Sequence, residues 1–177
     1  MSFVKNHYET VVQSDLVLTG LPISAFILPR PVKILLTLNS SSKLEEDVLS
    51  SLIILDLIGY QKSYFRKQIY TGVVIGSSVT LRGDRMYHFL SRILFEVLPR
   101  LKQFEGFRYP KHSSVYTFRL KDVLLFEGVT QVLSLSNSDL KDLRCEFYFN
   151  TINSLDILIL GRLLSVCFHK VHNPPHQ

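Results

Sequence analysis

Two arginines flank the point where a strand-like sequence pattern changes to a helical one. The stretch VTLRGDRMYHFL, residues 79–90, first alternates apolar and polar side chains and then shows helical spacing, with Arg82 and Arg85 on either side of the change. A helix N-terminus carries partial positive charge, so two cations there favour a bound anion. The Thr80 hydroxyl, both arginines and the first helical amides would together hold a phosphate group. The competing interpretation is a surface ion pair between Arg82 and Asp84, and spacing alone leaves both open.

Further basic and polar side chains are expected on strands of the same predicted sheet. Such a face suits a structured RNA, where phosphate and 2′-hydroxyl contacts dominate, although a merely solvated face is the alternative. The RNA-binding candidates are Lys33, Thr37, Asn39, Gln61, Lys62, Arg66, Lys67, Thr80, Arg82, Arg85 and Arg92, with Arg119 and Lys121 joining Arg92 in second rank.

The C-terminal segment CFHKVHNPPH contains side chains that bind metals in other proteins. Cys167, His169, His172 and His176 have spacings that a metal could use. The segment is terminal, contains prolines and lacks a second ligand pair, so a frayed tail is the favoured interpretation. We therefore predict no metal site and no cofactor.

Other short motifs point to structure and not to catalysis. TGVVIGSS, residues 71–78, fails the P-loop pattern because no lysine follows, and is interpreted as a flexible connection into the third strand. The acids of LEED, residues 44–47, complement the dipole of a helix first turn. No serine or cysteine stands in a nucleophile elbow or triad context, so the chain is not predicted to be an enzyme.

Length and composition indicate one folded domain, residues 1–177. The hydrophobic content is 46%, the charged content 20%, the net charge +5 and the pI about 9.2, which makes an acidic partner such as nucleic acid plausible. Cys145 and Cys167 lie in apolar surroundings and are interpreted as buried thiols in a reducing compartment. Apolar runs are too short or interrupted by charges to span a membrane. The N-terminus lacks signal-peptide and presequence features, so work inside an organelle would imply synthesis there.

Hydrophobic periodicity predicts an α+β fold, with a largely antiparallel sheet of about five strands and helices packed on one face. The predicted strands are residues 32–39, 61–70, 79–83, 113–121 and 144–150, with Val32, Ile34, Leu36 and Leu38 turned inward in the first. Helices are predicted within residues 1–22 (3–16, ending near Gly20 and Pro22), 39–59 with serine caps, 84–99 and 154–168, before a tail at 169–177.

The central helix has the clearest apolar stripe, formed by Met86, Phe89, Leu90, Ile93, Leu94, Val97, Leu98 and Leu101. Arg85, His88 and Arg92 fall on the opposite side, and Pro99 is expected to end or kink the helix. Asp84 is the predicted N-cap, and Gly83 supplies the turn before it. If Leu94 is fully buried, its truncation to alanine would cost about 2–5 kcal/mol.

The run IGSSVTLRGDRMYHFLSRILFEVLPRLKQFEGF, residues 75–107, resembles the signature region of a ribosomal protein family. That family is the universal large-subunit ribosomal protein number five, whose members carry a VTLRG-x-x-M-Y-x-F-L core followed by LPR and F-x-G. The resemblance implies an α+β sandwich without catalytic activity that binds 5S rRNA and a large-subunit rRNA helix in the central protuberance. The anion at the helix N-terminus would then be rRNA phosphate.

Several positions depart from the family pattern. Thr37 replaces an asparagine, Asn39 and Ser41 replace glycines, and Glu105 reverses the charge of an arginine. Ser114 to Tyr116 and Phe126-Glu127 also differ from the usual motifs. The segment between Lys62 and VTLRG is shorter than in the family, where it reaches the P-site tRNA, so a tRNA contact stays open.

This divergence, with many Phe, Leu, Ile and Ser residues and a modest charge, favours a mitochondrial and organelle-encoded member; a plastid or bacterial origin is the alternative. The predicted function is that of a structural constituent of the large ribosomal subunit, bound to 5S rRNA or large-subunit rRNA beside neighbouring ribosomal proteins. The alternative is a protein-interaction module that keeps the fold but docks mainly on other proteins.

Overall fold

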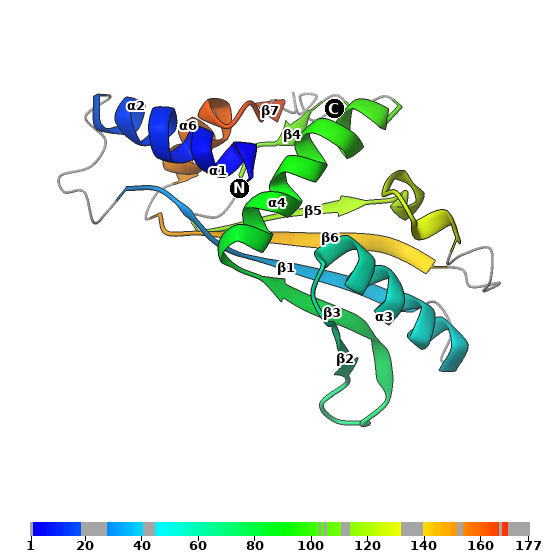
Figure 1. Cartoon of the computed structure of the whole chain (residues 1–177). Coiled ribbons are helices and arrows are strands. Elements are labelled where there is room, and N and C mark those ends of the chain that lie inside the picture. The colour runs from blue at the N-terminus through cyan, green and yellow to red at the C-terminus, as the bar shows by residue number, and fades with distance from the viewer. Residues whose placement is uncertain are drawn as a thin grey trace, which may run out of the picture.

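The computed structural model describes residues 2–18, 28–40, 45–102, 104, 106–110, 114–131, 140–151, 154–166 and 168–169. One antiparallel sheet has the strand order β2-β3-β1-β6-β5 (Figure 1). These strands are β1 (Pro31–Ser40), β2 (Tyr64–Lys67), β3 (Val74–Leu81), β5 (Val115–Leu120) and β6 (Leu140–Phe149). Two short strands, β4 (Phe107–Arg108) and β7 (Phe168–His169), pair in parallel.

The helices pack on one face of this sheet, which confirms the predicted α+β class (Figure 1). The N-terminal helical segment comprises α1 (Phe3–His7), a π-helical turn η1 (Tyr8–Val12) and α2 (Gln13–Leu18). The central helix comprises α4 (Gly83–Arg92), the π-helical turn η3 (Ile93–Val97) and the 3₁₀ turn η4 (Leu98–Arg100). The others are α3 (Glu45–Gly59), the 3₁₀ turn η5 (Val123–Leu125) and α6 (Ser154–Leu163).

Every second side chain of the strands points into the core, as predicted, with one exception. Ile34, Leu36 and Leu38 are fully buried beneath the helices, and so is Cys145 of β6. Val32 is 46% exposed, because the pairing of β1 with β6 shifts register beside it and the strand leaves the core there. Burial raises the pKa of the Cys145 thiol well above its ordinary value, which makes it unreactive in the folded protein.

The central helix buries Met86, Phe89, Leu90, Ile93 and Val97, as its stripe predicts, while Leu94 is only partly buried. Gly83 has φ +56°, and the helix ends in the turn that contains Pro99. The predicted N-cap is wrong: the chain stays extended through Arg82, which takes the N-cap position without a side-chain cap. Asp84 therefore lies inside the first turn.

Several predicted boundaries are also wrong: β2 is shorter than residues 61–70, β6 begins at Leu140 and not at residue 144, and α3 begins at Glu45 because β1 continues to Ser40. Strand β3 begins at Val74 and not at residue 79, so most of the supposed connection belongs to the sheet. There a Cβ on Gly76 would collide with the Leu38 carbonyl oxygen of the neighbouring strand, which explains the glycine. Helix α6 ends at Leu163 and not at residue 168, because Ser165 adopts a left-handed φ of 63° and the chain turns into β7.

Some predictions concern residues outside the described part of the chain. These are the serine caps at Ser41 and Ser42, the helix end near Gly20 and Pro22, Glu105, and the side chains of the tail with Cys167, His172 and His176. Within the described ranges no helix is long and apolar enough to cross a membrane, and no three His, Cys, Asp or Glu side chains are placed to hold a metal.

Candidate nucleic-acid interface

Three chain segments meet at the strand-to-helix junction. The Arg85 guanidinium donates a hydrogen bond to the Gln61 side-chain oxygen at 3.1 Å, and the Gln61 amide nitrogen donates to the Thr80 carbonyl at 3.2 Å. Arg82 and Arg85 are both exposed. The structure thus brings together four predicted site residues, with two cations directed toward solvent at the start of α4.

The alternative pairing of Arg82 with Asp84 is wrong. The Asp84 carboxylate instead forms an ion pair with the Lys5 ammonium of α1 at 2.6 Å. Their hydrogen bond lowers the pKa of Asp84 and raises the pKa of Lys5, so both groups are charged at neutral pH. Arg82 is therefore not neutralised by the nearest acid in sequence.

The sheet face opposite the helices carries most of the other candidates. Lys33 and Asn39 of β1, Arg66 of β2 and Arg119 of β5 lie on this face by strand register. The Lys33 ammonium lies 4.2 Å from the centre of the Tyr148 ring, a cation–π contact across the neighbouring strands. The face is therefore basic and polar, as predicted.

Thr37 is on the same face but is only 5% exposed. Its cross-strand partners are Ser78, which is equally buried, and the longer Arg144. A short side chain between such neighbours lies below the surface, so Thr37 is not an exposed contact in this structure.

Arg92 was predicted to contact RNA, but the structure buries its side chain. Its side chain is buried and donates hydrogen bonds to the carbonyls of Ile58 at 2.9 Å and Leu57 at 3.5 Å, at the C-terminus of α3. Its guanidinium also forms an ion pair with Glu96 at 3.4 Å. The last carbonyls of a helix lack intrahelical partners and attract cations, so Arg92 caps α3 from a neighbouring helix.

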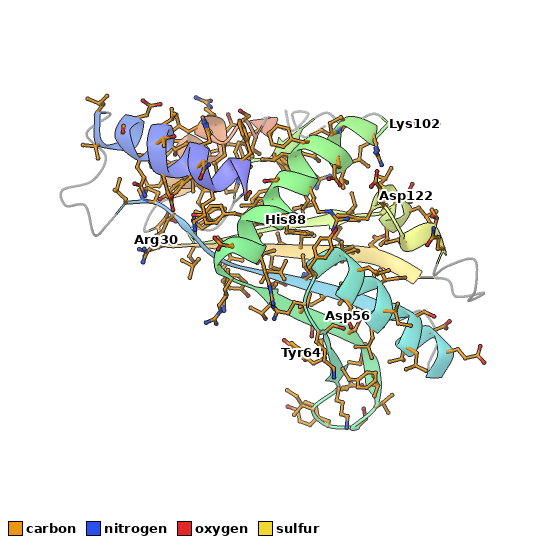
Figure 2. The ribbon with its side chains drawn as sticks, viewed as in Figure 1. Arg30, Asp56, Tyr64, His88, Lys102 and Asp122 are labelled. Atoms are coloured by element: carbon orange, nitrogen blue, oxygen red, sulfur yellow. The ribbon has the colours of Figure 1, made fainter. Side chains whose placement is uncertain are left out.

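The β2–β3 hairpin projects from the body of the molecule (Figure 1). Lys67 is exposed on it, and Lys62 is exposed just before it. Ile69 and Tyr70 at its tip are 92% and 95% exposed, and Tyr64 near its base, labelled in Figure 2, is about half exposed. Basic and aromatic side chains are thus presented together on the most protruding part of the described chain.

The sequence interpretation missed several polar side chains at these surfaces. Arg144 and Tyr148 lie on the open sheet face, where Glu146 pairs with Arg144 at 2.8 Å and accepts from the Tyr148 hydroxyl at 2.9 Å. Alternation with the inward Cys145 of RCEFYFN would have placed them there. Tyr60 beside the junction had no such signal, because its position depends on how α3 meets α4.

Comparisons with known proteins identify relatives of this chain. Residues 74–144, which include β3, α4 and β5, match the family of C-terminal regions of the ribosomal protein uL5. The chain is also 30% identical over 141 residues to the large ribosomal subunit protein uL5m of Reclinomonas americana, and the alignment covers 73% of this chain and 78% of that relative.

Proposed function

Because this chain belongs to the uL5 family of large-subunit ribosomal proteins, as a mitochondrial-type member, we propose that it binds 5S rRNA or large-subunit rRNA in the central protuberance. Its role in the large subunit is structural, and the proposal assigns it no catalytic step. We place it in the mitochondrial ribosome on the basis of its relative, and we propose that it is encoded in the organelle.

The observation that carries this proposal is the pair of exposed arginines at the start of α4. The hydrogen bond from Arg85 to Gln61, which itself donates to the Thr80 carbonyl, places the Arg85 guanidinium beside the end of β3. No side chain caps the N-terminus of α4, where Arg82 holds the N-cap position. The first amides of α4 and Arg82 therefore complete a site of the kind that binds anions at helix N-termini. The basic sheet face continues this surface across the neighbouring strands.

A salt series tests the role of these arginines. For binding to a transcript of the organelle's candidate 5S-type rRNA, the double variant Arg82→Ala/Arg85→Ala is expected to weaken affinity and to reduce the slope of log K against log salt by about two, roughly one per lost phosphate contact. The measurement is a filter-binding or anisotropy titration at several salt concentrations.

A matched control removes two cations from the other end of the same helical segment. Arg100→Ala/Lys102→Ala lowers the net charge equally, and Arg100 is exposed and pairs only weakly with Glu127 at 3.4 Å. This control is expected to keep the wild-type slope. An unchanged slope in Arg82→Ala/Arg85→Ala would contradict phosphate binding at the junction.

The proposal also includes a contact between the β2–β3 hairpin and P-site tRNA. The shorter length of the hairpin argues against a reach equal to that of other family members, whereas its exposed Lys67 and Tyr70 suit an RNA surface. Of the two, the rRNA contact at the junction has the stronger support, because two exposed arginines meet a helix N-terminus there.

A different surface favours an additional contact with a neighbouring ribosomal protein. Leu49, Ile53 and Leu57 form a ridge along α3, and each is 39–53% exposed. The helix contains four acids and no lysine or arginine, so its charge repels phosphate (Asp56 is labelled in Figure 2). We propose that this ridge packs against an apolar protein segment flanked by basic side chains.

Photocrosslinking in assembled large subunits tests this protein contact. With p-benzoylphenylalanine at position 53, the crosslinked product is expected to be sensitive to protease and resistant to ribonuclease, because the ridge faces protein. A product that ribonuclease digests, or no product in subunits that contain the chain, would contradict the proposed contact.

A further inference from the structure

A groove of about 560 Å³ lies between the C-terminal end of α3 and the first turns of α4. Tyr60 and His88 supply aromatic surface in it, Arg85 supplies a cation and Asp84 supplies a carboxylate. His88, labelled in Figure 2, is exposed on α4. The groove therefore borders the junction where Arg85 is held by Gln61, but it extends away from the sheet along α4.

Tyr60 lines this groove, contacts two side chains of α4 and still has most of its surface exposed. The residue has a left-handed φ of 48° directly after α3, a conformation that tyrosine rarely adopts. The Arg92 guanidinium lies 5.1 Å from the centre of its ring, and the His88 ring meets it edge-on at 5.4 Å. Even so, Tyr60 is 60% exposed. An exposed aromatic ring of this kind can stack on a nucleic-acid base.

The charges around the groove leave a net positive site. Asp84 is paired with Lys5 of α1, and Arg92 is paired with Glu96 of the central helix. Arg85 makes a hydrogen bond to the neutral Gln61, so among the described side chains its charge is not matched by an ion pair. A ligand with one negative charge and one flat, polar ring system matches this arrangement.

We propose that the groove binds a single unpaired nucleotide of RNA, whose base stacks on Tyr60 and whose phosphate pairs with Arg85. Unpaired bases are commonly recognised by stacking on aromatic side chains and by hydrogen bonds to their edges. The Asp84 carboxylate can accept a hydrogen bond from a base amino group, and His88 offers a further polar contact. Bases stacked inside a duplex cannot enter such a groove. This inference rests on the proposed function and assigns single-stranded RNA to one place on its surface.

The test compares two RNA probes, a single-stranded oligoadenylate of eight nucleotides and a blunt RNA duplex of eight base pairs. Loss of one stacked base weakens binding by about 1–3 kcal/mol, or about 5- to 150-fold. Tyr60→Asn, which keeps a residue that tolerates the left-handed backbone, is therefore expected to weaken oligoadenylate binding by such a factor and to leave duplex binding unchanged. Tyr60→Phe is expected to bind both probes as wild type does.

Phe95→Ala is the control, because it removes an aromatic side chain of similar exposure, 57% against 60% for Tyr60, from a part of the central helix that does not line the groove. It is expected to keep oligoadenylate affinity. Urea unfolding of each variant is measured alongside, since Tyr60 also contacts Arg92, and binding is compared only where the variants are folded.

The outcomes separate this inference from the proposed function. If wild type binds rRNA with a steep salt dependence but Tyr60→Asn keeps its oligoadenylate affinity, the groove assignment is overturned and the rRNA-binding function stands. Equal losses for oligoadenylate and duplex would also overturn it, because phosphate alone would then be recognised. If wild type binds neither the rRNA transcript nor the oligomers, the proposed function itself fails.

Discussion

Replacing Phe89 with alanine is expected to lower the free energy of unfolding by about 3–5 kcal/mol. Phe89 is 1% exposed in the centre of α4, and its ring stacks on Phe126 with centroids 6.1 Å apart. Its removal takes away the transfer free energy of the ring and leaves a cavity between α4 and the segment after β5. Well-packed neighbours relax only partly, so the cavity itself adds to the cost.

Equilibrium unfolding in urea measures this loss, and Leu94→Ala provides the control on the same helix. Leu94 is only partly buried and lines an existing apolar cavity of about 50 Å³, so its truncation is expected to cost less than the 2–5 kcal/mol that full burial would imply. Equal losses for the two variants would contradict the packing described here. Because Phe89 also lines the groove beside Tyr60, RNA binding by Phe89→Ala does not test the interface.

The periodic features of the sequence predicted the fold well. The apolar stripe through Met86, Phe89 and Ile93 predicted a buried helix face, and the alternation in β1 predicted one inward face. Each pattern has a single way to bury its apolar side chains. Alternation in β3 likewise predicted that Thr80 lies on the face opposite Val79 and Leu81, which are both fully buried. Local patterns therefore suffice where a residue's environment depends on its own strand or helix.

Side chains whose environment depends on two elements could not be assigned in this way. Arg92 lies opposite the apolar stripe of its own helix, which predicts exposure, but the end of α3 covers it. Thr37 alternates correctly and is still buried by its cross-strand neighbours. Tyr60 contacts Arg92 and His88, which approach it from another helix. Each outcome depends on tertiary contacts that no local pattern encodes.

Replacing Arg92 with alanine is expected to destabilise the protein by about 1–3 kcal/mol, the usual cost when a buried acceptor loses its donor. The change leaves the Ile58 carbonyl without its 2.9 Å donor and removes a planar group packed between the rings of Tyr60 and Phe126. Thermal and urea unfolding measure this loss of stability.

Two further variants show whether the burial or the charge of Arg92 is responsible for the loss of stability. Arg85→Ala removes the same charge from an exposed position of the same helix and is expected to change stability by no more than about 0.5 kcal/mol. Arg92→Lys keeps the charge but loses the planar fork that serves two carbonyls, so it is expected to recover only part of the stability. Arg92→Gln removes the charge but keeps a hydrogen-bond donor, and at a temperature where this variant is folded it should retain the wild-type salt dependence of rRNA binding. A reduced slope in that variant would return Arg92 to the RNA interface, whereas an unchanged slope with low stability would establish it as the cap that joins α3 to α4.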